Sequence, residues 1–466
     1  MLNIEEVAQA LRQPAGPSTL FASEASITLN REAFVRACHV TWKEIHVKTV
    51  NQLLFWEGFL KREKTNPIGP AIADMAEYQR HVSRKINDSI VWTLAGMRRH
   101  VVKRLCLYHP RPWLTEANSE VVMKVIRDIN ADPLSIAIWN DATSCVDVGD
   151  ISYIESGLSP ELKFLELKEG RVNEKVMKLI ETQEEEGFQE QFKLFEAEHG
   201  KAGISQYKRA TRQKQVSESA LELLQNDEGI DPVTNLQMRV IDLKGTGGDS
   251  YDKQLNEVLK KALDAPESEC IELISDCIWV YATANRKAGF HAARLIAQER
   301  IAERVSLFAN TLRRKLPAWD RDRIFCLTDG FRIPMAKPLF LRSLDIPIVA
   351  SVVEGDLMLK VFFYLDWERF RPVAQAAGGE FTWSSEKDAR RSRSLDPHIR
   401  PPVFGGRLAQ IQNGSTKYQI TDPNLVQMFF DGTTPKAVAQ SVMKTATILE
   451  ENPSLLEGLG QPLRRP

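Results

Sequence analysis

Cysteine is scarce in this chain, since its 466 residues include only six, and none of these forms a C-x-x-C pair. Zinc sites and redox centres need closely spaced thiols, so the sequence argues against both. The cysteines stand singly in apolar surroundings, which is typical of reduced core residues. They are Cys38, Cys106, Cys145, Cys270, Cys277 and Cys326.

Long hydrophobic runs are also missing. The most apolar late stretch, residues 346–365, is interrupted by Glu354, Asp356 and Lys360, which excludes a spanning helix there. The first residues, MLNIEEVAQALRQPAG, begin with acids and lack the basic and apolar segments of a signal peptide. We therefore expect a cytoplasmic protein that has no membrane partner.

No excess charge of one sign marks the chain, because 61 Lys and Arg face 62 Asp and Glu. Hydrophobic residues make up 43% and charged residues 26%, as in an ordinary folded protein. Any nucleic-acid-binding surface must then be a local patch. Common hydrolase motifs are absent too: there is no H-E-x-x-H, no G-x-S-x-G, and GTGGDSYDK lacks the phosphate-loop spacing.

The pattern of apolar residues predicts three regions. Residues 1–79 are predicted to be a helical N-terminal region, although a second long helix is expected to continue over 72–107. Residues 80–290 follow as a helix at 119–130, strands at 134–139, 144–155 and 163–170, and helices at 173–199 and 205–226. Residues 291–466 are predicted to form a C-terminal α/β region of unassigned role.

Finer elements are expected on both sides of residue 290. The fold class is α/β, in which helices flank a mixed β-sheet. The sequence predicts one strand at 271–283, further strands at 323–329, 346–353 and 357–365, an exposed loop at 384–402 and a helix at 434–452.

The stretch most informative about chemistry begins at Asp150. Fifteen residues separate it from Glu166, Leu167 and Lys168, and both positions are predicted to lie in strands. Side chains alternate along a strand, so Glu166 and Lys168 share a face, which Asp150 joins if the strands pair. Two carboxylates are ligands suited to Mg²⁺, and a nearby lysine can orient or deprotonate an attacking water. The predicted reaction is phosphodiester hydrolysis.

Gly149-Asp150-Ile151 followed by Glu166-Leu167-Lys168 resembles the signature of the PD-(D/E)xK nucleases, the restriction-endonuclease-like superfamily. The resemblance covers about residues 134–216. It implies a mixed sheet flanked by helices, Mg²⁺ or Mn²⁺ held by Asp150 and Glu166, and Lys168 as catalytic lysine. It also implies a nuclease acting on DNA in prokaryotic restriction, repair or phage defence. The alternative is an inactive member that binds nucleic acid or another protein.

Two helices offer candidate substrate contacts. Many members of that superfamily carry Gln or Arg on a helix after the ExK strand, and here Gln206, Arg209 and Gln213 share one helical face. Arg98 and Arg99 open a second basic stretch, which is either a solvated face or a strip that binds phosphates.

One part of the signature has no single match. The superfamily places an acid on the helix before the first strand, and this chain offers Asp88, Glu120, Asp141 and Asp147. The number of metal ions therefore stays open. The sequence also leaves open DNA against RNA, endonuclease against exonuclease, and whether residues 291–466 bind substrate, a partner protein or a second copy.

Overall fold

The structure is a computed structural model, which describes the chain in segments. These are residues 2–12, 31–63, 69–106, 113–155, 162–167, 171–183, 187–226, 228–230, 237–239, 249–264, 269–284, 290–304, 324–354, 359–395, 403–404, 407–414 and 416–452.

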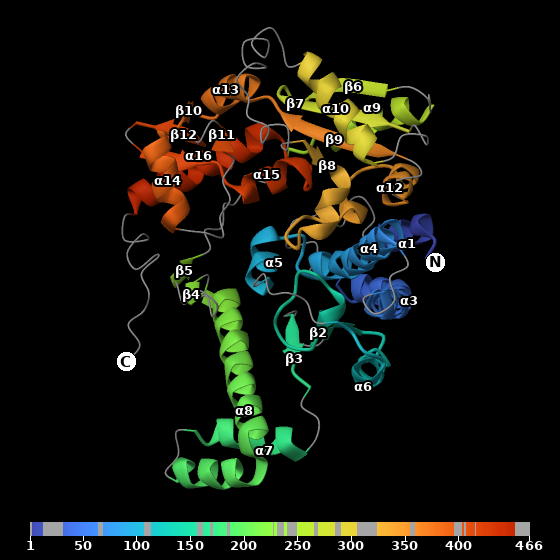
Figure 1. Cartoon of the computed structure of the whole chain (residues 1–466), viewed down its shortest axis with the longest axis vertical. Coiled ribbons are helices and arrows are strands. Elements are labelled where there is room, and N and C mark those ends of the chain that lie inside the picture. Colours follow the sequence, from blue (N-terminus) through green and yellow to red (C-terminus); the bar gives the residue numbers. More distant parts are fainter. Residues whose placement is uncertain are drawn as a thin grey trace. The chain divides into compact units, whose positions relative to one another are not determined.

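The described residues form two compact units (Figure 1). Unit 1 combines residues 2–12 with residues 249–452, and unit 2 contains residues 31–239. This division differs from the expected boundaries at 79/80 and 290/291. The first of these falls inside one continuous helix, Pro70–Leu94, and the second falls between strands that pair in a single sheet of unit 1.

Unit 2 begins with two long helices that pack against each other, α3 (Arg31–Glu63) and α4 (Pro70–Leu94). Pro70 starts α4, where its missing N–H costs nothing. After the helix ends at Leu94, Gly96 and Met97 have φ of 64° and 60°, and α5 (Arg99–Leu105) follows. The single helix expected over 72–107 is therefore broken, because left-handed residues cannot continue a right-handed helix.

A three-stranded antiparallel sheet follows these helices, in the order β1-β2-β3. Helix α6 (Glu116–Ile129) begins after Thr115, whose side chain accepts a hydrogen bond from the Asn118 amide. Residues of α3 and α6 share a hydrophobic cluster with the sheet, including Leu53, Ile126 and Trp139. The strands are β1 (Ser135–Trp139), β2 (Ile151–Glu155) and β3 (Lys163–Leu165).

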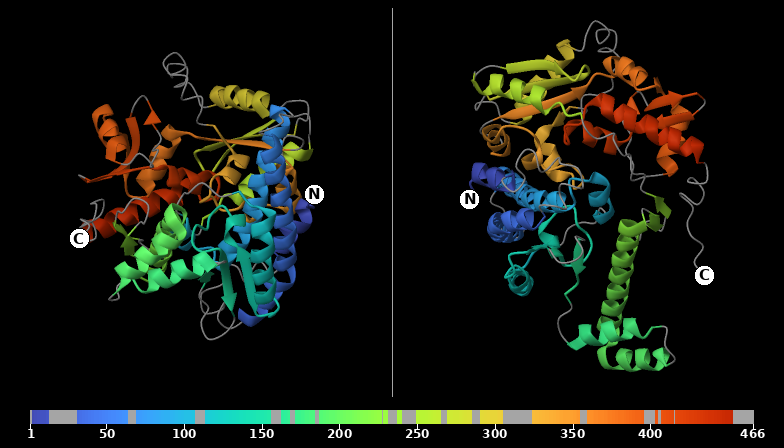
Figure 2. Two further views of the ribbon diagram at one scale, coloured as in Figure 1. Left: turned by 60° about the horizontal axis from the view of Figure 1, so that its bottom comes forward. Right: turned by 180° about the vertical axis from the view of Figure 1, so that it is seen from behind.

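A helical hairpin completes unit 2, as the views in Figure 2 show. Helix α7 (Arg171–Glu181) packs on α8 (Phe188–Asn226), and a small hairpin of β4 (Glu228–Ile230) and β5 (Gln237–Arg239) comes next. The break predicted near Gly200 is confirmed as a kink, since Gly200 has φ 56° and ψ −154° inside α8.

Unit 1 contains a four-stranded antiparallel sheet with the order β6-β7-β9-β8. Helices α9 and α10 pack against it. The N-terminal helix α1 (Ile4–Arg12) packs on α12 and η4, and the Arg12 guanidinium donates to the carbonyls of Phe340 and Leu344 at 2.7 and 2.6 Å. The elements are α9 (Asp252–Asp264), β6 (Glu269–Ile274), β7 (Ile278–Thr283), α10 (Phe290–Arg304), β8 (Phe325–Cys326), η4 (Leu339–Leu341), α12 (Ile346–Val353) and β9 (Lys360–Leu365).

A second sheet in unit 1 has β12 between β10 and both β11 and β13. Trp367 and Phe381 stack with ring centroids 5.5 Å apart and join helix α13 to this sheet. The elements are α13 (Trp367–Ala376), β10 (Glu380–Trp383), α14 (Glu386–Leu395), β11 (Val403–Phe404), β12 (Arg407–Asn413), β13 (Thr416–Gln419), α15 (Asp422–Phe429) and α16 (Pro435–Glu451).

The mixture of helices and strands is confirmed, but several finer predictions are wrong. Residues 346–353 are a helix instead of a strand, and Pro347 lies in its first turn. Residues 271–283 are two strands, because Ser275 and Asp276 turn the chain at φ of 48° and 67°. Part of the expected loop at 384–402 is helix α14. Every strand pairing in the described segments is antiparallel, so the mixed sheet is not found in them.

None of the described helices combines the length and the apolar content that a membrane span requires.

Candidate active site

The strands beside Asp150 and Glu166 pair with each other, but neither acid lies in a strand as predicted. The strand expected from residue 144 begins only at Ile151, and the one expected to continue through Glu166 ends at Leu165. Ile151 lies opposite Leu165 in the antiparallel register of β2 and β3. Asp150 and Glu166 are the next residues after this pair, where the ladder has ended and the Asp150 N–H donates to the Leu165 carbonyl. Both acids are half-buried.

The neighbours of the two acids pack against the hydrophobic cluster of α3 and α6. Ile151 is a member of that cluster, and Leu165 and Leu167 pack against it. Alternation along an extended chain predicts that Asp150 and Glu166 point away from the cluster. Leu167 thus faces the core, as the motif spacing predicted.

A direct hydrogen bond fixes Asp150 at the centre of the ExK sequence. Its carboxylate accepts the backbone N–H of Leu167 at 2.6 Å, and its own N–H donates to the Leu165 carbonyl at 2.9 Å. The strand β3 ends at Leu165, so the Asp150 side chain takes the place of a strand partner for the next residues. Lys168 lies outside the described residues.

Gly149 has a physical reason to be glycine. Its φ of 67° is left-handed, and a Cβ there would lie 3.2 Å from the Leu165 carbonyl oxygen and 3.3 Å from Phe164 Cβ. A side chain at residue 149 would therefore push the backbone of β3 away. The glycine of the motif allows the close approach of the two chains.

Asn140 braces the same loop and was missed by the sequence analysis. Its side-chain Nδ2 donates to the carbonyls of Val148 and Gly149 at 2.7 and 3.1 Å, and its backbone N–H donates to that of Asp150 at 2.9 Å. Asparagine directly after a buried strand was the signal available, because its side chain mimics a backbone turn. Asn140 Oδ1 is buried and accepts no hydrogen bond within the described residues.

Behind the site, helix α4 holds residues 141–144 through buried polar side chains. The Arg84 guanidinium donates to the carbonyls of Asp141 and Thr143 at 2.5 and 2.9 Å and pairs with the buried Glu57 at 2.8 Å. The Asp88 carboxylate accepts the Ser144 N–H at 2.6 Å as well as the Ser144 hydroxyl. These bonds fix the chain that leads from β1 toward Asp150.

His46 on α3 adds a further buried link. Its Nε2 accepts the backbone N–H of Trp139 at 3.1 Å, and its Nδ1 lies 3.0 Å from Asn87 Oδ1. Because Nε2 accepts, the proton resides on Nδ1, and the ring is neutral. Burial lowers the pKa of His46 to about 4, although the hydrogen bond to Asn87 acts in the opposite direction.

Among the described residues, no third acid completes a metal-binding group with the pair. Asp88 is fully buried and forms a 3.0 Å ion pair with Lys85, while Glu120 is exposed on α6. Asp141 and Asp147 are half-buried in the segment between β1 and β2. Within the described segments, no group of three His, Cys, Asp or Glu side chains could hold a metal ion.

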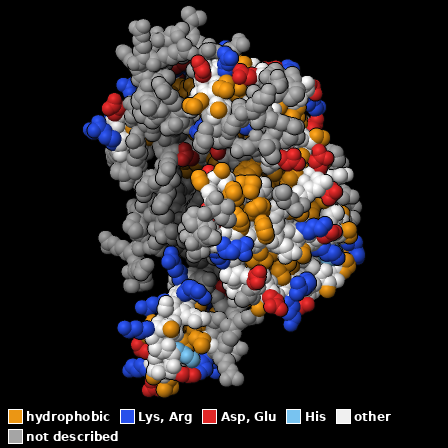
Figure 3. Space-filling view, turned by 45° about the vertical axis from the view of Figure 1, so that its right-hand side comes forward, with side chains coloured by type: hydrophobic (Ala, Val, Ile, Leu, Met, Phe, Trp, Pro, Cys, Tyr) orange, Lys and Arg blue, Asp and Glu red, His pale blue; other side chains and the backbone are white. Residues whose placement is uncertain are grey.

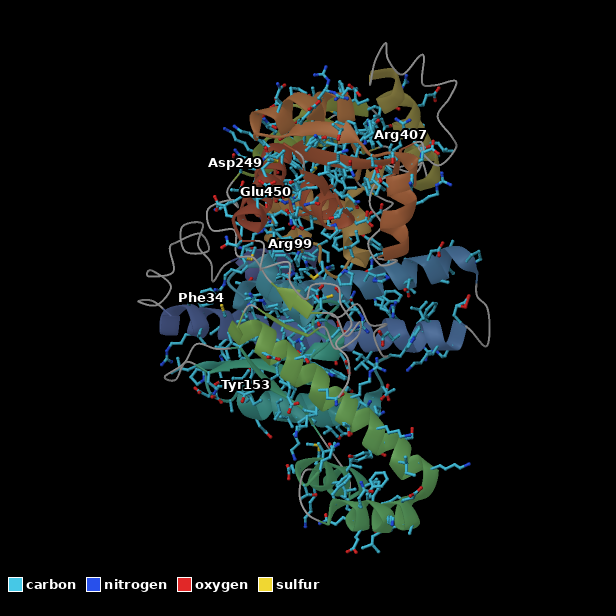
Figure 4. All side chains as sticks on the ribbon, turned by 90° about the vertical axis from the view of Figure 1, so that its left-hand side faces the viewer. Phe34, Arg99, Tyr153, Asp249, Arg407 and Glu450 are labelled. Carbon is cyan, nitrogen blue, oxygen red and sulfur yellow. The ribbon has the colours of Figure 1, made fainter. Side chains whose placement is uncertain are left out.

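The predicted substrate contacts lie on two helices of unit 2. Gln206 is half-buried and Arg209 exposed on α8, and the side chain of Gln213 lies outside the described residues. Arg98 is exposed just before α5, and Arg99 is half-buried in its first turn (Figure 4). Helices α5 and α8 pack against each other, so the two groups belong to adjoining elements.

Comparison of the sequence with protein-family models, with curated proteins and with solved structures finds no match. What the chain does must therefore be inferred from the residues of the site.

Proposed function

We propose that the chain is a metal-dependent nuclease that hydrolyses phosphodiester bonds in DNA. One observation carries the proposal: Asp150 and Glu166 adjoin the paired residues Ile151 and Leu165, and the Asp150 carboxylate accepts the backbone N–H of Leu167, the residue after Glu166. Stability does not require two neighbouring carboxylates here, because like charges close together are destabilising.

The residues present are suited to a hard divalent cation. Asp150 and Glu166 would hold Mg²⁺ or Mn²⁺, since both prefer carboxylate oxygens. Asn140 Oδ1, an unbonded buried acceptor on the residue that braces Asp150, supports a place for a cation or its water in this loop. When bound, the ion would act as a Lewis acid on the phosphate oxygens.

The remaining role falls to Lys168. In the proposed mechanism its ammonium group orients the attacking water and offsets the negative charge that develops on the phosphorus oxygens. Leu167 packs against the core, and the alternation expected of an extended chain would place Glu166 and Lys168 together on the opposite face. The biological setting that we propose is prokaryotic restriction, repair or phage defence, inside the cell.

The test uses purified protein with supercoiled plasmid, linear duplex, single-stranded DNA and RNA, each with Mg²⁺, Mn²⁺ or EDTA. We expect metal-dependent cleavage that is lost in Lys168→Ala, Asp150→Asn and Glu166→Gln. Glu155→Gln is the matched control, because Glu155 is another carboxylate on β2 that pairs with Lys163 at the surface and should leave cleavage intact. Cleavage in EDTA, or equal cleavage by the site variants, would overturn the proposal.

A second candidate is a nuclease-like scaffold that binds nucleic acid or a protein without cutting. It is favoured by the finding that the described segments supply only two acids at the site. Salt-sensitive DNA binding together with no cleavage under any metal condition would select this candidate.

A further inference from the structure

Helix α8 changes charge at its kink. Glu190, Glu196 and Glu198 precede Gly200, whereas residues 201–217 contain no Asp or Glu. The same stretch carries five cations, so its local charge is strongly positive in a chain whose total is −1. These cations are Lys201, Lys208, Arg209, Arg212 and Lys214.

Three of the cations form one line on the helix surface. Tyr207 and Ala210 are buried against α7 and the earlier turns of α8. Lys201, Lys208 and Arg212 follow at intervals of seven and four residues, which places them on the side away from that core. All three side chains are exposed, and Figure 3 shows Lys and Arg side chains gathered over the α7 and α8 lobe.

The three cations of the line have no ion-pair partner among the described residues. The basic stretch makes one ion pair in the described part of the chain, between Lys214 and Glu218 at 3.8 Å. Lys201, Lys208 and Arg212 form none there. The face predicted from the sequence, with Gln206, Arg209 and Gln213, lies beside this line. It carries one cation, Arg209.

We propose that the line of Lys201, Lys208 and Arg212, the basic line of α8, binds the phosphate backbone of duplex DNA without regard to sequence. Neighbouring cations on the line are separated by roughly 6 to 10 Å along the helix axis. Phosphates are spaced closely enough along B-DNA for each cation to meet a different one. The proposal rests on the proposed function, because it assigns the polymer that the nuclease site would cut.

Duplex is favoured over single strands by the absence of stacking surfaces. Binding of single-stranded nucleic acid relies on aromatic side chains on which bases stack. Residues 201–217 contain one aromatic residue, Tyr207, and it is buried at 9% exposure. The exposed side of this stretch can therefore neutralise phosphates but offers no ring to an unpaired base.

Binding of a 30-base-pair duplex in EDTA, measured by fluorescence anisotropy over a range of salt, tests the proposal. The triple variant Lys201→Gln, Lys208→Gln, Arg212→Gln should bind at least about tenfold more weakly. Its slope of log affinity against log salt should be about 2.7 smaller, at about 0.9 for each lost phosphate contact. Lys253→Gln, Lys260→Gln, Lys261→Gln is the control, since it removes three exposed cations from α9 and should change binding little.

Three outcomes would overturn the proposal: equal weakening by both triple variants, an unchanged salt slope, or a larger loss of binding to single-stranded DNA or anionic lipid vesicles than to duplex. Circular dichroism confirms that the variants are folded. Failure of the proposed function is seen separately, because Asp150→Asn should lose cleavage while its duplex binding in EDTA is retained. A chain that binds through α8 and never cuts would refute the nuclease and leave the basic line supported.

Discussion

The carboxylate of Asp150 accepts the backbone N–H of Leu167 at 2.6 Å, which ties the end of one strand to the ExK sequence that follows the next. A charged acceptor makes such a bond about twice as strong as a neutral one. The position of Asp150 thus depends on the backbone of Leu165 and Leu167 as well as on β2, which it precedes. The first two predictions follow from this arrangement.

Gly149→Ala should move Asp150 away from the ExK sequence. The left-handed φ of 67° costs an alanine about 1 kcal/mol, and contact of its Cβ with the Leu165 carbonyl adds to that cost. We expect loss of most cleavage activity and a destabilisation of about 2 kcal/mol in denaturant unfolding. Gly96→Ala is the matched control, since its φ of 64° carries the same strain but only the end of Arg98 is near. Equal effects of the two substitutions would contradict the prediction.

Asn140→Ala should loosen the loop before Asp150. It leaves the carbonyls of Val148 and Gly149 without their Nδ2 partner, at a cost of about 1 to 3 kcal/mol. Unfolding experiments measure the cost, and a lower kcat at unchanged duplex affinity shows that Asn140 acts by positioning. Asn118→Ala on the exposed face of α6 serves as the control. An unchanged kcat would show that the Asp150 loop is held by other contacts.

Unit 2 should lose stability as the pH falls from about 6.5 toward 4. Burial lowers the pKa of His46 to about 4 from 6.5, so between these values the unfolded chain binds more protons than the folded one. Its contribution, on the order of 3 kcal/mol, is fully present above 6.5 and is lost as the pH drops through the folded pKa. Denaturant unfolding across this range measures the loss, and His46→Gln should flatten it. A profile that is the same in both proteins would rule out His46 as the cause.

Unit 1 should depend strongly on the buried pair of Arg342 and Asp252. The two side chains are joined at 2.5 Å and nearly inaccessible, and Arg342 also donates to the carbonyls of Phe429 and Phe430. Arg342→Met should cost about 3 to 5 kcal/mol, because Asp252 is left as an unpaired buried charge. Lys261→Met, which breaks the exposed pair with Glu272, should cost under about 1 kcal/mol. Equal losses of unfolding free energy in the two variants, measured by chemical denaturation, would contradict this prediction.

The strand at 134–139 was predictable from its short-range pattern, and the next two strands pair with each other as the site requires. The ends of those two strands were not predicted, since Asp150 and Glu166 lie just outside them. The bracing by Asn140, Asp88 and His46 was not predictable, since each contact joins residues that are distant along the chain. Nothing in the sequence near Asp88 tells that its partner is Ser144 on the loop after β1.

The wrong predictions have local physical causes. Residues 346–353 are apolar except for Ser351, so the pattern carries no period that separates a buried helix from a strand. The turn at Ser275 and Asp276 contains no glycine although both residues have positive φ, and it was therefore predicted as part of one strand. Met97, which follows Gly96, also has a positive φ without being a glycine. The break between α4 and α5 was therefore not predicted either.

Helix α1 has a consequence for synthesis of the chain. Val7, Ala8 and Leu11 are buried in unit 1, and Arg12 bonds to the Phe340 carbonyl, 328 positions later. The ribosome therefore releases this helix long before its binding surface exists, and all of unit 2 is made in between. Unit 2 can fold while α1 still exposes its apolar side to solvent, and unit 1 is the part whose assembly waits for residues far along the chain.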